Sequence, residues 1–177
     1  MIPAVTGDAS NGTAARVGRM ATGQRLGGFI YGTIVVLSVI VGGARAFPHE
    51  PGRIALAALV TAVIFWLAHV YAHALAQSVG TGQHLTVSEV RRIGRREASL
   101  IEAAVPPIAA LLLGALGIVS EQVALWLAFT LGLVVLGAQG VLFARAERLG
   151  AAATIAVVAL NLALGAVLVG LKLLVSH

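Results

Sequence analysis

The sequence predicts an all-α protein, a polytopic integral membrane bundle of about five transmembrane helices. Apolar residues make up 59% of the 177 residues and charged residues only 11%, whereas soluble domains carry about 25% charged residues. The mean hydropathy is +0.97. The apolar residues also gather in long runs separated by short connections, which is the pattern of a chain that crosses a bilayer several times.

Five apolar stretches come close to the roughly 20 residues that a helix needs to cross about 30 Å of hydrocarbon. They cover residues 26–43, 54–78, 99–119, 122–143 and 151–173 within a predicted transmembrane bundle at 26–177. Residues 1–25 are expected to form a disordered cytoplasmic tail. Because the connections are short, no soluble catalytic domain has room to fold outside the membrane.

The basic residues near the span ends predict the orientation. One side collects nine of them and the other side three: Arg16, Arg19, Arg25, Arg91, Arg92, Arg95, Arg96, Arg145 and Arg148 against Arg45, Arg53 and Lys172. The N-terminus is therefore expected in the cytoplasm and the C-terminus outside. The excess of arginine over lysine, with abundant Ala, Gly, Val and Leu, is typical of GC-rich bacterial coding and indicates a bacterial inner membrane.

The first apolar run also has an alternative interpretation. The basic leading segment, one apolar stretch and the letters GARA before Phe47 resemble a signal peptide with its cleavage site. Cleavage there would leave four spans with unchanged orientation.

An amphipathic basic helix is predicted at 86–98. The letters TVSE from Thr86 to Glu89 have the form of a capping box, in which the two residues exchange hydrogen bonds at a helix start. The helix would place Val87, Val90 and Ile93 on one side. Four arginines then face anionic lipid headgroups on the inner leaflet, an interpretation that we favour over nucleic-acid binding: Arg91, Arg92, Arg95 and Arg96.

Glycines recur in the predicted spans and indicate close helix packing. Gly28 and Gly32 form a G-x-x-x-G pair, and Gly132, Gly137, Gly140, Gly165 and Gly170 mark the last two spans. Helices in lipid associate through such small residues because their backbones can approach closely. The motif serves contacts within one chain or between chains, so a homo-oligomer or a larger membrane complex is expected as one outcome.

The polar centre is predicted where three polar residues follow one helix face. His69, His73 and Gln77 are spaced four residues apart, and this face must point into the bundle because unpaired polar groups in hydrocarbon are costly. From the 1.5 Å rise per residue, His73 and Glu102 both lie about 10 Å from the midplane. The sequence therefore predicts a proton or cation site formed by Glu102, His73 and His69.

Further residues are expected to support this site from the other spans. Tyr31, Gln139 and Asn161 lie in the inner half of the membrane or near its centre. Pro106 and Pro107 remove two backbone donors, so the third span should kink there and expose carbonyls near Glu102.

Proton-linked transport or channel activity is the function that this pattern favours, because imidazole and carboxyl groups can exchange protons near neutral pH. The alternative is a non-catalytic accessory or scaffold subunit in which the same residues hydrogen-bond between helices. A divalent metal on His69, His73 and Glu102 is a weaker possibility, and otherwise no cofactor is expected. No nucleophile and base with known spacing occur, so an enzyme is not favoured.

Overall fold

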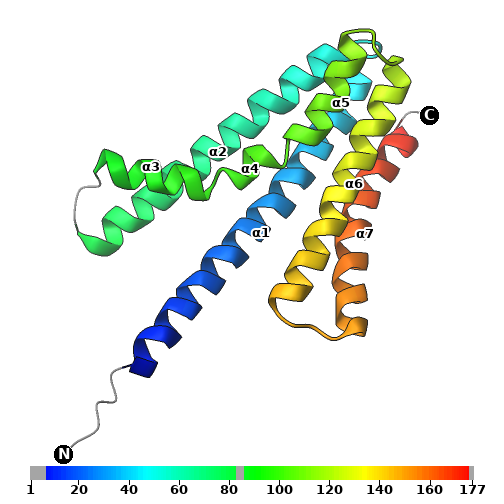
Figure 1. Ribbon diagram of the computed structural model, residues 1–177. Helices are drawn as coiled ribbons and strands as arrows, with labels where there is room; N and C mark the ends of the chain where they lie inside the picture. The colour runs from blue at the N-terminus through cyan, green and yellow to red at the C-terminus, as the bar shows by residue number, and fades with distance from the viewer. Residues whose placement is uncertain (1–6, 83–85, 176–177) are drawn as a thin grey trace, which may run out of the picture.

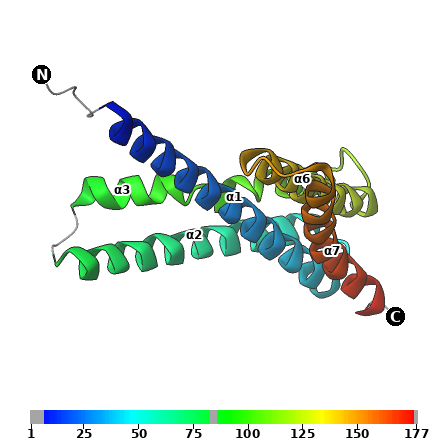
Figure 2. The same cartoon turned by 90° about the horizontal axis from the view of Figure 1, so that it is seen from below.

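The computed structural model describes residues 7–82 and 86–175, which fold into seven α-helices without a strand among them (Figure 1). The helices are α1 (Gly7–Ala46), α2 (Pro51–Thr81), α3 (Val87–Arg96), α4 (Ser99–Glu102), α5 (Val105–Ala115), α6 (Glu121–Ala146) and α7 (Ala151–Val175). Helix α1 runs through the middle of the molecule (Figure 2), with α2 and α3 on one side and α6 and α7 on the other.

Three helices are long and apolar enough to cross a membrane, over Arg25–Ala46, Pro51–Gly80 and Glu121–Ala146. The segments Val87–Glu102 and Val105–Ala115 are bent by 52° relative to each other, and they add a fourth span if they are counted as one. These helices are compatible with a membrane-embedded protein. The described part of the chain thus gives three or four spans by length and composition, and the fifth, in α7, stays a prediction.

The start of α1 differs from the expectation of a disordered tail at 1–25. The helix begins at Gly7, so residues 7–25 form its first turns, and residues 1–6 lie outside the described residues. The letters AARVGRMATGQR are rich in good helix formers. Extending a helix also costs much less than nucleating one, so the apolar span can carry the helix into the polar segment.

Helix α3 begins with the predicted capping box, which the structure confirms. The Thr86 side chain accepts from the Glu89 backbone N–H, and the Thr86 backbone N–H donates to the Glu89 carboxylate at 2.7 Å. The hydrogen bonds from the Thr86 backbone and hydroxyl, together with the Arg92 charge, hold the pKa of Glu89 below its ordinary value.

The buried face of α3 is rotated from the predicted one. Ile93 is buried as expected, but Val87 is 86% exposed and Val90 is also exposed. Gly94 and Glu97 complete the buried side instead. The reason is the short distance between Gly94 and α2, since a β-carbon on Gly94 would lie 3.3 Å from the Trp66 ring.

The chain breaks between α4 and α5 at Ala103–Ala104, just before the two prolines. Pro106 and Pro107 occupy the first turn of α5, where a proline is tolerated because the first backbone N–H groups of a helix have no partner within it. The bend therefore lies slightly earlier in the chain than the predicted kink.

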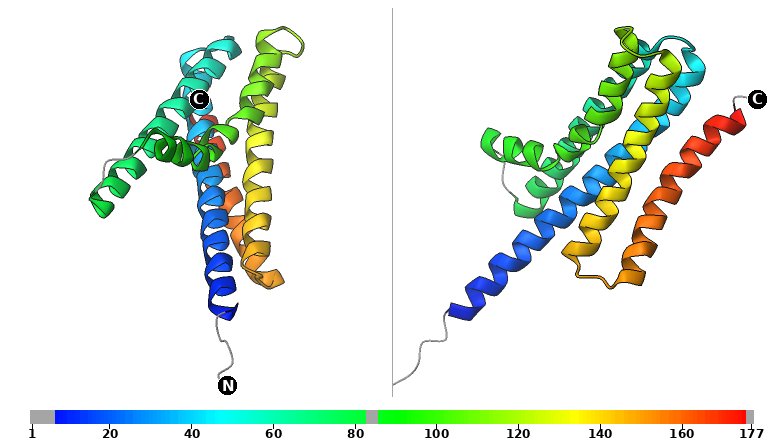
Figure 3. Two further views of the ribbon diagram at one scale, coloured as in Figure 1. Left: turned by 60° about the vertical axis from the view of Figure 1, so that its left-hand side comes forward. Right: turned by 45° about the vertical axis from the view of Figure 1, so that its right-hand side comes forward.

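Glycines make the close helix contacts within this chain. A β-carbon on Gly32 would lie 2.8 Å from the Leu100 carbonyl oxygen, and one on Gly132 would lie 2.6 Å from Leu37. In Figure 3 α6 and α7 run side by side, and Gly140 and Gly165 lie at their contact. The side chain at position 170 lies outside those described.

The apolar core fills the space between α1, α2, α5 and α6. Its large, fully buried members include Val36, Leu37, Ile40, Ile54, Leu111, Phe129 and Leu136. This core holds the helices together, while the polar residues of interest lie further along α2, where α3 and α4 cover it (Figure 1).

Candidate functional site

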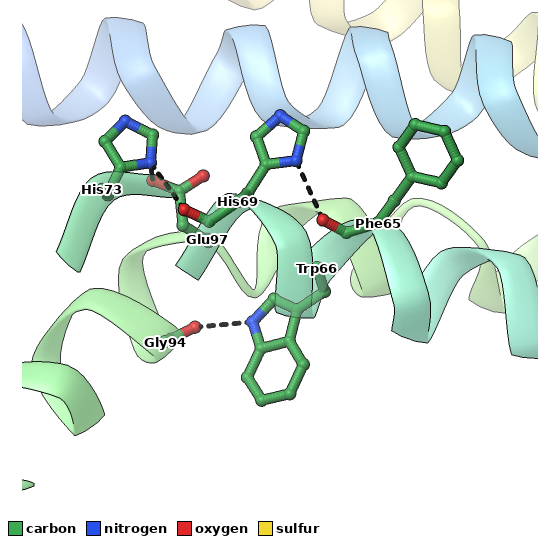
Figure 4. A network of polar contacts seen from close by, with 6 residues as sticks. All are labelled: Phe65, Trp66, His69, His73, Gly94 and Glu97. Atoms are coloured by element: carbon green, nitrogen blue, oxygen red, sulfur yellow. Dashed lines mark hydrogen bonds and ion pairs between the residues drawn. The ribbon is translucent and has the colours of Figure 1, made fainter. Parts of the chain in front are cut away.

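The histidine rings of α2 are held by the backbone of their own helix. The Nδ1 atom of His69 lies 2.9 Å from the Phe65 carbonyl oxygen, and that of His73 lies 3.0 Å from the His69 carbonyl oxygen (Figure 4). A carbonyl only accepts hydrogen bonds, so each neutral ring must carry its hydrogen on Nδ1. Nε2 is then the ring nitrogen that can take up a second proton.

Glu97 is the carboxylate that meets this histidine face. Its Oε1 atom lies 3.5 Å from His73 Nδ1, and its side chain is only 8% exposed. His73 Nδ1 thus lies within 3.5 Å of both the His69 carbonyl oxygen and a buried carboxylate. We call these two residues the His73–Glu97 pair.

The position of Glu97 follows from how α3 ends and docks on α2. Glu97 is the C-cap of α3, and its backbone N–H donates to the Ile93 carbonyl. One turn earlier, the Trp66 indole N–H donates to the Gly94 carbonyl oxygen at 2.9 Å (Figure 4). This bond fixes α3 against α2, and therefore sets the carboxylate beside His73.

The Tyr31 ring of α1 lies beside the same face of α2. Its ring centroid lies 5.5 Å from that of His69 and 5.9 Å from that of Phe65. Gln77, one turn beyond His73, is half-buried and takes part in an interaction of its own. The site thus has residues from α1, α2 and the end of α3.

Glu102 lies in a different interaction from the one predicted. Its Oε2 atom is 3.5 Å from the Arg25 guanidinium, and the two side chains are 47% and 56% exposed. Exposed ion pairs of this kind contribute about 0–1 kcal/mol. Glu97 is the C-cap of α3 whereas Glu102 is the last residue of α4, so the two carboxylates come from different helices.

The remaining predicted residues lie at other helix contacts. Asn161 is buried, and its amide donates to the Leu136 carbonyl of α6 at 3.3 Å. Gln139 is buried on α6, and its Oε1 has no hydrogen-bond partner among the described residues. Pro106 and Pro107 start α5. None of these four has a described contact with the histidines.

The predicted metal set does not form in the part of the chain that the structure describes. No group of three or more His, Cys, Asp or Glu side chains there is arranged to hold a metal ion. His69, His73 and Glu102 are not grouped as the three-ligand site that their spacing suggested, and Glu102 lies beside Arg25 instead.

The arginines of α3 line a groove together with Arg25 of α1. The groove has a volume of about 610 Å³, and Val87 and Ser88 complete its wall beside Arg91, Arg92, Arg95 and Arg96. The four arginines of α3 are exposed, as the sequence predicts. The participation of Arg25, which comes from the first helix, could not be foreseen from the local sequence.

Comparison with known proteins gives no relative from which a function could be transferred. No family model matches the chain, and neither a curated protein nor a solved structure matches it. The function must therefore be argued from the site itself.

Proposed function

We propose that this chain is a small multi-pass membrane protein with proton-linked transport or channel activity, and that the His73–Glu97 pair is its protonation site. The observation that carries the proposal is the buried Glu97 carboxylate 3.5 Å from His73 Nδ1. Ionisable residues within membrane helices are rare and usually functional, because burying a charge is costly. His69 and Tyr31 extend the polar face next to the pair.

The chemistry of the pair suits proton exchange. Imidazole gains or loses its charge near neutral pH, and a proton taken up on His73 Nε2 would let the Nδ1 hydrogen pass to the Glu97 carboxylate. The side chain of His73 is 46% exposed, so its ring is not enclosed within the contact with Glu97. Glu97, in contrast, is only 8% exposed, so water screens its contact with His73 less than it screens an exposed pair.

The proposal includes a topology. We propose five spans, with the N-terminus in the cytoplasm of a bacterial cell and the C-terminus outside the inner membrane. The α3 arginines then face the anionic inner leaflet, and the bent α4–α5 segment enters the membrane beside the pair. Anionic lipid is the partner that this placement implies.

Proton flux into liposomes tests the activity. Wild-type protein, Glu97→Gln and Glu102→Gln would be reconstituted with a pH-sensitive dye inside, and an imposed pH gradient would drive the flux. Both substitutions replace a carboxylate by an amide of the same shape, so Glu102→Gln is the matched control. We expect Glu97→Gln to lose the flux and Glu102→Gln to retain it. Absent flux in the wild type, or equal flux in all three, contradicts the proposal.

A second candidate function, an accessory subunit of a larger membrane assembly, is favoured by the surface of α2. Only 22% of its apolar window is buried, against 39% for α1 and α6. Ala68, Ala72 and Ala76 form an exposed stripe with a spacing of four residues, a pattern typical of contacts between membrane helices.

The oligomeric state distinguishes the accessory function from proton transport. Under it, the purified protein forms a homo-oligomer or retains a partner in mild detergent, and Ala72→Ile disrupts that assembly because the larger side chain separates the helices. Monomeric wild-type protein that conducts protons would favour the transport function instead. Ala163→Ile, on the exposed surface of α7, is the matched control.

A further inference from the structure

The groove between α1 and α3 concentrates positive charge from two separate helices. Five of its seven lining residues are arginines, four from α3 and Arg25 from α1. Its volume of about 610 Å³ falls within the roughly 300–1,000 Å³ of sites that bind small molecules. A basic helix that only lies on a lipid surface needs no residues from another helix. The groove, in contrast, includes Arg25 of α1 as well as residues of α3, which indicates a binding site with a defined shape.

The arginines of the groove lack enough acidic partners within the protein. Of the five groove arginines, only Arg25 has a carboxylate of a described residue within 4.0 Å, and the four arginines of α3 form no salt bridge with one. Arg91 and Arg95 are one turn apart, as are Arg92 and Arg96, and like charges at this spacing destabilise a helix. A bound anion would reverse that repulsion.

The walls of the groove are held in place by contacts already described. The Trp66–Gly94 hydrogen bond fixes α3 on α2, and the close contact of Gly32 with the Leu100 backbone sets α1 against α4. Ser88, whose hydroxyl is hydrogen-bonded to that of Thr86 at 2.9 Å, and Val87 complete the wall. The two helices that carry the arginines are therefore positioned before a ligand arrives, which lowers the entropy cost of binding.

We propose that this groove binds a phosphate-bearing anion with at least two negative charges, a phosphomonoester or a diphosphate. The planar guanidinium group binds phosphate oxygens through two parallel hydrogen bonds, which explains the preference for arginine over lysine here. The ligand is either the headgroup of a lipid or a soluble diphosphate. This inference does not depend on proton transport, since it uses neither His73 nor Glu97.

Two probes distinguish the sources of the ligand. Inorganic pyrophosphate is titrated into the protein in uncharged detergent by calorimetry, and phosphatidic acid is offered in phosphatidylcholine nanodiscs, with retained lipid counted by native mass spectrometry. Pyrophosphate binding that phosphatidic acid displaces assigns the site to a lipid headgroup. Pyrophosphate binding that phosphatidic acid leaves unchanged assigns it to a soluble diphosphate. Either result supports the site.

Arg25→Gln distinguishes binding in the groove from non-specific electrostatic attraction to the arginines of α3. We expect it to weaken pyrophosphate binding about tenfold, the effect of losing one charged hydrogen-bonding group. Glu102→Gln removes the ion pair of Arg25 without removing the arginine, so it should bind at least as well as wild type. Arg53→Gln, about 20 Å along α2 from Trp66 where α3 docks, makes the same change in net charge and should leave binding unchanged.

Three results would overturn the proposal. The first is failure of the wild-type protein to bind either probe. The second is equal binding by wild type and Arg25→Gln, which would show only diffuse attraction to α3. The third is binding of a short DNA duplex that pyrophosphate does not displace, which would make the arginines a nucleic-acid surface.

Discussion

The contact between α1 and α4 depends on the missing side chain at Gly32, which makes Gly32→Ala a sharp test of the packing. A β-carbon there would lie 2.8 Å from the Leu100 carbonyl oxygen and 3.0 Å from the Leu100 Cα. Both atoms belong to the backbone, so rotating a side chain cannot relieve the clash. Overpacking of this kind costs about 1–3 kcal/mol.

Gly42→Ala supplies the matched control in the same helix. Nothing lies within 4 Å of a β-carbon at Gly42. Both variants gain the roughly 0.5–1 kcal/mol by which alanine favours a helix over glycine, so this term cancels in the comparison. We therefore expect Gly32→Ala to have a free energy of unfolding about 1–3 kcal/mol lower than Gly42→Ala.

The assay is equilibrium unfolding in mixed micelles, followed by circular dichroism as a denaturing detergent is added. Gly28→Ala adds an intermediate case, because the new β-carbon would meet the Ser99 hydroxyl, which can rotate away. The expected order of stability is Gly42→Ala, then Gly28→Ala, then Gly32→Ala. Equal stability of the Gly32 and Gly42 variants would refute the close contact between α1 and α4.

Other contacts give smaller effects. Thr86→Ala removes the cap of α3 and should speed amide exchange in its first turn about fivefold, as expected for a loss of ~1 kcal/mol. In the wild type, the protection of these amides from exchange should be complete above the ordinary pKa of Glu89. It should be lost as the pH falls through the lowered pKa of Glu89 in the folded protein. Trp66→Phe keeps the ring but removes the bond to Gly94, which should lower the free energy of unfolding by about 0.5–1.5 kcal/mol. Asn161→Leu should cost only about 0.6 kcal/mol in the same titration. An unchanged stability of Trp66→Phe would contradict the docking of α3 on α2.

The features that local sequence rules govern were predicted well. The capping box at Thr86 and Glu89 involves residues three positions apart, so its geometry depends on little else. The spans in α1, α2 and α6 could likewise be predicted from their own residues, because length and composition decide whether a helix can cross a bilayer.

The partner of His73 could not be found from span depth alone. Glu102 was chosen because its estimated height matched that of His73, but height says nothing about direction around the helix axis. Glu97 lies four residues after Ile93, so both share the face of α3 that packs on α2. That spacing was the available signal, and we missed it because the face was predicted to run through Val87 and Val90, which are exposed.

The contribution of Arg25 illustrates a second limit. It lies 66 positions before Arg91 in the sequence, and nothing in either segment indicates that the two line one groove. Whether Arg25 and Arg91 line the same groove depends on how α1 crosses α3 and α4, and this crossing is set by the contact of Gly32 with Leu100. Long-range placement of this kind requires the packed structure.

Infrared difference spectroscopy tests most directly whether Glu97 is the acid of the protonation site. Spectra of reconstituted protein at neutral and acidic pH would be subtracted, and the carbonyl stretch of a buried, newly protonated carboxyl group would be sought. We predict that this band is present in wild type and in Glu102→Gln and is missing in Glu97→Gln. A band that persists in Glu97→Gln, or that disappears in Glu102→Gln, would contradict the assignment.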